Sequence, residues 1–250
     1  MSLTDLLGRV TSYTYEIWGN VLTRTQSLNG APVTWSYTYN GFGQVLTATD
    51  PLGNTTTNVY DAKGNLTSTT TPSPDGTQAG STTSFAYDVK GQLTSVTDPR
   101  GNATNIFYTA AGLIDHITDA QSNTTTFAYD ARANRTSVTD ALGRTTSFTY
   151  NNMNRLTSIT YPDLTHTDFA YDTRGRRSSV TDANAKVTSY AYDDSDRLTS
   201  VTDAQTPTHG VTRYAYDTEN NLTSITDALG RQTSFTYDSL GRVTQTTFPS

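Results

Sequence analysis

The chain has 250 residues and a net charge of −6, and it contains no cysteine. The missing thiols exclude disulfides and thiolate metal sites, and the singly scattered Lys and Arg residues do not form the cationic groove that a nucleic-acid backbone requires. No apolar run is long enough for a membrane-spanning helix, so no membrane span is predicted. Thr, Tyr and Phe are abundant and no apolar spacing typical of a helix is sustained, which predicts an all-β chain.

The dominant pattern is a tyrosine that recurs along the chain and is followed by a turn-forming residue. Most steps between successive tyrosines are 21 residues long, and three are longer. This period predicts one array of about eleven repeats over residues 1–250, with partial repeats at both ends, rather than a single globular core. The anchor tyrosines are Tyr15, Tyr39, Tyr60, Tyr87, Tyr108, Tyr129, Tyr150, Tyr171, Tyr192, Tyr216 and Tyr237.

The chain starts and stops in mid-repeat, at 4–9 and at 248–250, as expected of a fragment of a longer protein. Residues 1–3 are too short for a signal peptide and are interpreted as a cloning remnant. The missing signal peptide therefore carries little information about location.

Each repeat contains two turn signals about ten residues apart. The first follows the tyrosine, as in the Asp-Ala-Lys-Gly of 61–64, and the second lies in mid-repeat, as in the Asp-Pro-Leu-Gly of 50–53. Asp at the first position and Gly at the fourth predict a type I turn closed by a residue in the left-handed conformation.

Several turns replace the glycine at that fourth position. Asn and Asp tolerate a positive φ, so Asn154, Asp196 and Asn220 are expected to keep the turn type. Alanine and serine tolerate it poorly, so the turns at three further positions are expected to differ in type or to be strained. These positions are Ser122, Ala133 and Ala185.

The runs between the turns, such as 93–97 and 145–150, are short and rich in β-branched and aromatic residues, and they are predicted to be strands. Each repeat then forms one antiparallel hairpin, and the chain forms a meander of roughly twenty-two strands. A sheet of that width does not stay flat, so the array is expected to coil into a ribbon, a spiral or a partial hollow shell.

The assignment of side chains to the two faces is ambiguous. Counting through the mid-repeat turn places Val138 on the face of Phe148 and Tyr150, and counting through the tyrosine turn places Leu156 on that face too. Leu156 and Ile159 have opposite parity, so the strand contains a bulge, or one turn has another length, or apolar residues lie on both faces. The preferred interpretation places the Tyr and Phe ladders on a concave inner face.

The motif Tyr-Asp-x-x-Gly-Arg-Leu-Thr-Ser-Val-Thr-Asp-x-x-Gly, seen in good form at 87–101 and 237–244, resembles the Rhs/YD-repeat family. The resemblance covers essentially the whole chain. It implies a β-ribbon that spirals into a hollow shell, which encloses a carboxy-terminal toxin in bacterial Rhs, Tc-toxin and wall-associated relatives and forms part of an adhesion receptor in teneurins. The core segment that closes such shells and a toxin domain are both missing from this sequence.

Three repeats gain residues near the mid-repeat turn, around 26–32, 71–81 and 204–210. Alternate turns of a meander lie on opposite rims, so all three insertions are expected to form loops on the same rim. They are interpreted either as tolerated insertions or as binding loops. The candidate binding residues are Ser73, Pro74, Asp75, Gly76, Gln78, Thr206, Pro207 and His209.

Candidate chemistry elsewhere is sparse. The mid-repeat aspartates line one rim and offer carboxylates to Ca²⁺, but each one also suits an Asx-turn, and that interpretation is preferred. His116, His166 and His209 occupy different repeat positions, so no metal site is predicted. A residue that recurs in every repeat cannot be a unique catalytic group, and no enzyme activity, catalytic residue or cofactor is predicted.

Trp18 and Trp35 depart from the repeat consensus in the first two repeats. Exposed together on a rim, they offer a stacking surface for a carbohydrate, although tryptophan in a strand more often packs.

The predicted function is a non-enzymatic structural scaffold from a secreted or surface bacterial protein, namely a wall segment of a shell that encloses a toxin or other cargo. The alternative is a carbohydrate- or protein-binding adhesion module that acts through the inserted loops. The expected partners are accordingly an enclosed cargo domain or a surface ligand. Unpaired edge strands also favour edge-to-edge self-association.

Overall fold

The computed structural model describes residues 1–5, 9–28, 31–73, 79–204 and 210–249. It divides the chain into two units, Met1–Thr126 and Phe127–Ser250. The described residues contain strands and turns, and no helix among them is long and apolar enough to cross a membrane. All strands belong to one sheet of 23 strands, which confirms the all-β hairpin array.

The first unit contains the strands up to β12, within which the boundary between the units lies. These strands are β1 (Ser2–Thr4), β2 (Val10–Tyr15), β3 (Val21–Leu28), β4 (Ala31–Tyr39), β5 (Val45–Thr49), β6 (Thr55–Tyr60), β7 (Leu66–Thr71), β8 (Ser81–Tyr87), β9 (Leu93–Thr97), β10 (Ala103–Tyr108), β11 (Ile114–Thr118) and β12 (Thr124–Tyr129).

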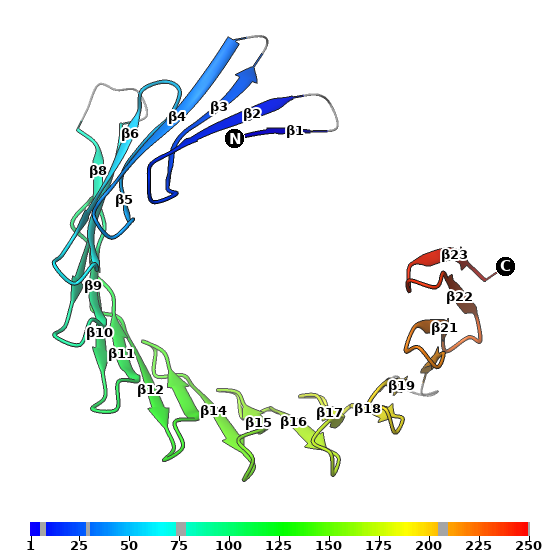
Figure 1. Cartoon of the computed structure of the whole chain (residues 1–250). Helices are drawn as coiled ribbons and strands as arrows, with labels where there is room; N and C mark the ends of the chain where they lie inside the picture. Colours follow the sequence, from blue (N-terminus) through cyan, green and yellow to red (C-terminus); the bar gives the residue numbers. More distant parts are fainter. Residues whose placement is uncertain (6–8, 29–30, 74–78, 205–209, 250) are drawn as a thin grey trace. The chain divides into compact units, whose positions relative to one another are not determined.

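The second unit contains the remaining strands, which are β13 (Arg135–Thr139), β14 (Thr145–Tyr150), β15 (Leu156–Thr160), β16 (His166–Tyr171), β17 (Arg177–Thr181), β18 (Val187–Tyr192), β19 (Leu198–Thr202), β20 (Val211–Tyr216), β21 (Leu222–Thr226), β22 (Gln232–Tyr237) and β23 (Val243–Thr247). In each unit the strands follow one another in chain order and pair antiparallel with their sequence neighbours (Figure 1).

A β-bulge resolves the ambiguity about the two faces. Between β14 and β15, Phe148 pairs with Ile159 and Tyr150 pairs with Leu156, and the register shifts by one residue between these pairs. Val138 pairs with Thr146, so both ways of counting the faces are correct. The bulge was one of the three alternatives, and it recurs after the anchor tyrosine in both units.

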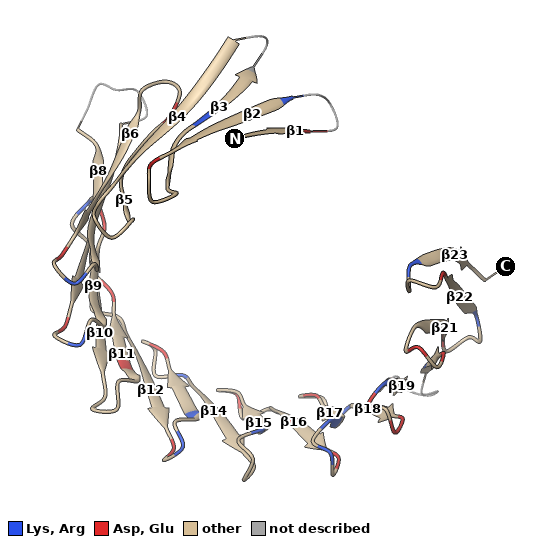
Figure 2. Ribbon diagram, viewed as in Figure 1, with Lys and Arg blue, Asp and Glu red and all other residues tan. Residues whose placement is uncertain are grey.

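The bulge gives the sheet two chemically different faces. The aromatic face carries the anchor tyrosines with their cross-strand partners, such as Tyr150 and Leu156. The hydroxyl face carries mainly Ser, Thr and Ala, and threonine hydroxyls bond across it, for example Thr149 to Thr157 at 3.0 Å. None of the described residues is buried, and the aromatic-face side chains of the central strands are half-buried. The charged side chains gather mainly in the turns (Figure 2).

All the substituted turns keep the predicted turn type. The residues at the fourth position have φ between 59° and 69°, and each main-chain N–H donates to the carbonyl of the first turn residue. The expectation for Asn154, Asp196 and Asn220 is therefore confirmed. For Ser122, Ala133 and Ala185 the first alternative, another turn type, is wrong, because the turn hydrogen bonds are kept. The second alternative holds: these residues lie at φ of 68°, 65° and 60°, where a Cβ has a steric cost. A seventh case, Leu164 at 68°, was not anticipated.

The first insertion extends a hairpin instead of forming a loop. Strands β3 and β4 pair from Thr23 with Ser36 up to Leu28 with Ala31, so the expected loop at 26–32 is wrong. The extra residues adopt the ladder because backbone pairing satisfies more N–H and C=O groups than an open loop would. The second insertion begins after the pair of Thr71 with Ser81. In the third, Asp203 N–H donates to Gly210 O at 2.8 Å.

Candidate functional site

Most turns open with an aspartate, and its carboxylate holds the turn together. In the turn between β6 and β7, Asp61 Oδ1 accepts the main-chain N–H groups of Lys63 and Asn65 at 2.8 and 2.9 Å. The side chain of Asn65 donates to Asp61 Oδ2 at 2.9 Å. The same arrangement occurs in mid-repeat turns such as that of Asp98. The Asx-turn interpretation of the aspartates is thus confirmed at these turns.

These contacts also fix the charge state of the turns. The hydrogen bond from the Asn65 side chain, joined by backbone N–H groups, holds the pKa of Asp61 below its ordinary value of 3.8. The corresponding asparagine lowers the pKa of Asp98 and Asp130 in the same way. Within the part of the chain that the structure describes, no group of three or more His, Cys, Asp or Glu is arranged to hold a metal ion.

The anchor tyrosines connect successive repeats through their hydroxyl groups. The Tyr171 hydroxyl, at the end of β16, donates to the carbonyl of Leu156 at 2.8 Å. Leu156 is the first residue of β15, the strand before β16. The acceptor lies 15 residues earlier, or 18 where the repeat is longer. The same bond is made by Tyr39, Tyr60, Tyr108, Tyr150, Tyr192, Tyr216 and Tyr237.

A second set of contacts joins the turns that follow the tyrosines, and the edge that these turns form is here called the tyrosine rim. In several of these turns the fifth residue reaches the next turn with its side chain. Gln44 and Gln92 donate to the carbonyls of Gly64 and Gly112 at 2.8 and 3.1 Å. Arg176 and Arg197 donate to the carbonyls of Asp193 and Asp217 at 3.0 and 2.9 Å.

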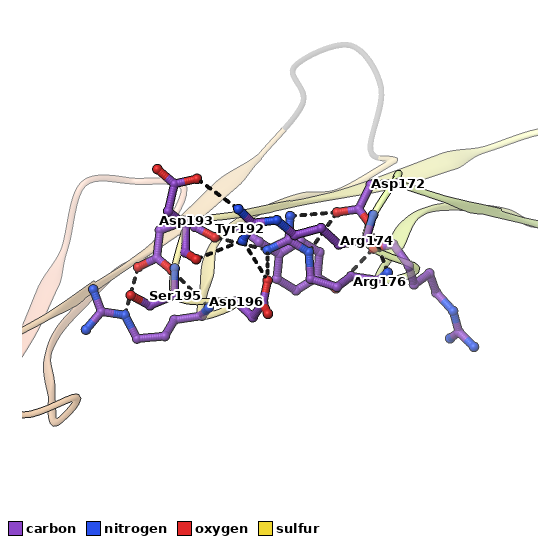
Figure 3. A network of polar contacts seen from close by, with 10 residues as sticks. Asp172, Arg174, Arg176, Tyr192, Asp193, Ser195 and Asp196 are labelled. Atoms are coloured by element: carbon purple, nitrogen blue, oxygen red, sulfur yellow. Dashed lines mark hydrogen bonds and ion pairs between the residues drawn. The ribbon is translucent and has the colours of Figure 1, made fainter.

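In the second unit this rim contains a network of ion pairs (Figure 3). Arg176 Nη1 lies 2.6 Å from Asp196 Oδ1, and Arg176 Nη2 lies 2.7 Å from Asp172 Oδ2. The Arg176 guanidinium also lies 4.6 Å from the centre of the Tyr192 ring, within the range of cation–π attraction. Arg174 Nη1 donates a hydrogen bond to the main-chain carbonyl of Asp194 at 2.7 Å. The network ties two successive repeats together.

The mid-repeat rim differs at the matching positions. Arg144 and Arg231 pair with the aspartate of their own turn, at 2.6 Å in both cases. In the structure as described, neither side chain hydrogen-bonds a neighbouring turn. Among the described residues, arginines thus couple one repeat to the next at the tyrosine rim, as Arg176 and Arg197 do, and not at the mid-repeat rim.

The candidate binding loops lie mostly outside the described residues. These are Pro74, Asp75, Gly76 and Gln78 in the second insertion, and Thr206, Pro207 and His209 in the third. Ser73 is described and half-buried, just beyond β7. The binding role of both loops stays a prediction.

The two tryptophans lie apart in the first unit. Trp18 lies in the turn between β2 and β3, is 84% exposed and borders a hollow with Phe42. Trp35 lies within β4, is half-buried and stacks under the Arg24 guanidinium at 4.8 Å. It borders a different hollow, with Leu3 and Val33 among its lining residues. The structure therefore does not bring the two rings into one platform.

The two described histidines, His116 and His166, lie in different strands and have different neighbours. His116 stacks on Phe107 with ring centres 4.2 Å apart. His166 Nε2 lies 3.3 Å from Asp168 Oδ2, and Ser158 Oγ donates to Asp168 Oδ1 at 2.6 Å. In this second cluster the carboxylate lies between the hydroxyl and the imidazole. The histidine is not placed to take the serine proton, so the arrangement does not form a nucleophile–base pair.

The links between repeats were missed from the sequence, although two signals were present. The first signal is the nearly constant interval between each anchor tyrosine and the residue that opens the following strand. The second is the recurrence of Gln, Asn or Arg as the fifth residue of the turn after the tyrosine. Neither signal shows that a phenol hydroxyl reaches the preceding repeat, because the sequence does not reveal which face the bulge assigns to each side chain.

Comparison with known proteins places these repeats in a family. Residues 121–250 match the family model of the teneurin YD-shell, and residues 39–78 and 60–103 match the RHS repeat. A comparison with curated proteins gave no match.

Solved structures show the same fold. The TcdB2–TccC3 structure without its hypervariable C-terminal region aligns with 97% of this chain at 17% identity and a TM-score of 0.66. The TcdB2–TccC3–Cdc42 structure aligns with 100% of this chain at 16% identity and a TM-score of 0.67. This chain covers 16% and 18% of those two chains.

Proposed function

Because the chain belongs to the teneurin YD-shell family, we propose that it is a non-enzymatic segment of the wall of a shell that encloses a toxin or other cargo. The shell would belong to a secreted or surface-exposed bacterial protein. The structural role fits a rim whose recurring aspartates, tyrosines and arginines bond within turns or between repeats.

The observation that carries this proposal is the uncovered aromatic face. The central strands present Tyr, Phe, Leu, Val and Ile side chains on one face, yet none of the described residues is buried. An isolated sheet ordinarily covers such a face with a second layer. A face that is apolar but uncovered suits a wall that borders another polypeptide.

The family resemblance supports the same role, because shells of this kind enclose cargo in the bacterial relatives. The likeness to TcdB2–TccC3 is at 16–17% identity and supports the fold of the wall. The identity of the cargo and the extracellular location belong to the proposal.

Cysteine labelling of the full-length gene product tests the proposal, because residues 1–250 contain no cysteine of their own. Thr188→Cys places a thiol on the aromatic face of β18, and Ala191→Cys places one on the hydroxyl face of the same strand. We expect slow maleimide labelling at position 188 in the full-length protein and faster labelling in residues 1–250 alone. The thiol at 191 is the matched control and should label at similar rates in both. Equal rates for the thiol at 188 in the two proteins would contradict the enclosure of cargo against this face.

A further inference from the structure

Two neighbouring turns of the tyrosine rim carry exposed aromatic rings in the first unit. Trp18 and Phe42 are each the third residue of their turn, and they are 84% and 77% exposed. At the same position in other repeats, Lys63, Arg132 and Arg174 donate to a carbonyl of the next turn. The two aromatic side chains thus occupy a position that couples repeats in those three turns, and they project into solvent.

A hollow with a polar floor lies between the two rings. It has a volume of about 590 Å³, and its lining includes Glu16, Asn20 and Gly43 besides the two rings. The Asn20 side chain donates to the Glu16 carboxylate. It also packs over Gly43, where an added Cβ would lie 3.3 Å from Asn20 Nδ2. Asn20 therefore bridges the two turns and forms the floor.

The chemistry of this surface selects one class of ligand. Exposed aromatic rings beside a few carboxylate and amide groups suit a molecule that is apolar on its faces and hydroxylated at its edges. Glu16 is the only charged residue in the lining, so the hollow offers no cation to a phosphate or a carboxylate. A neutral pyranose ring has the required faces and edges.

The spacing of the rings extends the argument to a chain of sugars. Equivalent positions of successive hairpins are two strand spacings apart, or roughly 10 Å. This separation matches alternate residues of an extended oligosaccharide, with the intervening residue over the polar floor. We propose that Trp18 and Phe42 form a binding site for a neutral, extended oligosaccharide, a role that goes beyond the proposed wall function.

Tryptophan fluorescence provides a direct test. Trp18 and Trp35 are the only tryptophans, so Trp35→Phe leaves Trp18 as the sole reporter. Cellohexaose is the extended probe and maltohexaose is the helical control. We expect cellohexaose to shift the Trp18 emission saturably to the blue and to protect it from acrylamide quenching, with maltohexaose at least about tenfold weaker.

Calorimetry on variants identifies the residues. Phe42→Ala and Trp18→Ala should each weaken cellohexaose binding by about tenfold or more, because each removes one stacking surface. Leu240→Ala is the matched control, since Leu240 occupies the same turn position in another repeat and is 75% exposed. It should leave binding unchanged. The proposal is overturned if cellohexaose leaves the Trp18 emission unaltered, if the double variant of Trp18 and Phe42 still binds, or if the emission changes only with protein concentration.

Discussion

The phenol hydroxyl of the anchor tyrosine explains why this position carries Tyr rather than Phe. Phe148 and Phe169 show that the sheet accepts phenylalanine two residues earlier on the same face. At the anchor position the phenol hydroxyl reaches a carbonyl of the preceding repeat, as Tyr171 does with Leu156 O, and a phenylalanine there could not make this bond. The ring supplies apolar contact, and the hydroxyl satisfies a strand-opening carbonyl that the bulge leaves available.

Replacement of Tyr171 by Phe should therefore destabilise the array by about 1 kcal/mol, the usual net value of such a hydrogen bond. The midpoint of urea unfolding measures the change. Tyr161→Phe is the control, because its hydroxyl makes only a 3.4 Å contact with Thr167, and its effect should be clearly smaller. Equal effects of the two substitutions would argue against a specific role of the anchor hydroxyl.

The alanines at positive φ offer a second residue-scale prediction. Ala133→Gly and Ala185→Gly should each stabilise the protein by up to about 1 kcal/mol, because glycine adopts φ near +60° without the steric cost of a Cβ. Thermal unfolding measures the gain. Two opposite changes serve as controls. Gly143→Ala, at φ 77° with open space around it, should cost about 1–2 kcal/mol, and Ala170→Gly within β16 should also destabilise. A loss of stability in both alanine-to-glycine variants would show that these turns are not strained.

At the scale of the element, the turns should make the array sensitive to acid. The folded pKa values of Asp61, Asp98 and Asp130 lie below the ordinary value, so their stabilising contribution is complete above about pH 3.8 and is lost as the pH falls further through the folded pKa values. We expect the thermal midpoint to fall below pH 4. NMR signals of these turns should titrate in the same range.

The turn that opens with Asn151 is a natural control for this effect. Its side-chain oxygen accepts the N–H groups of Met153 and Arg155 at 2.9 and 3.1 Å, as an aspartate would, but it carries no carboxylate. Its amide signals should stay constant while those of the aspartate turns move. If all turns shift together, a global change of the protein is responsible and not the turn carboxylates.

The two rims should respond differently to the loss of an arginine. Arg176→Leu removes the contacts to Asp172, Asp196 and the Tyr192 ring, whereas Arg144→Leu removes one pair within a single turn. We expect the Arg176 variant to unfold at a lower urea concentration than the Arg144 variant, with a difference that shrinks in high salt as the ion pairs are screened. Equal midpoints in low salt would contradict the coupling of repeats through this rim.

The sequence predicts the local elements well and the contacts between them poorly. The strands and turns follow from β-branched runs bounded by Asp and Gly, and the turn at 61–64 has the predicted form. The extended hairpin of β3 and β4 was mistaken for a loop, because Gln26 to Pro32 contains no strong alternation. At Ala133 and Ala185 the sequence left open a change of turn type or strain, and the hydrogen bonds of the turn decide for the strained conformation. The distance between Trp18 and Phe42, and the floor that Asn20 provides, depend on the register between hairpins.

At the scale of the whole molecule, the strands of each unit pair with their sequence neighbours and no residue in the described ranges is buried. Stability in such an array is a sum of local terms. Gly143→Ala should therefore lower hydrogen-exchange protection in β13, β14 and β15 and leave β5 and β6 unchanged. Site-resolved exchange by mass spectrometry measures this. A uniform loss of protection along the chain would indicate one cooperative unit instead.

The direction of the tyrosine bonds has a consequence for synthesis on the ribosome. In each such pair the acceptor carbonyl is made first, and the tyrosine that satisfies it follows 15 or 18 residues later. At translation rates of about 5–20 residues per second, every new repeat waits roughly one to four seconds for the residue that completes it. The nascent chain therefore always ends in an unfinished hairpin, and the finished ribbon grows behind it at the pace of translation.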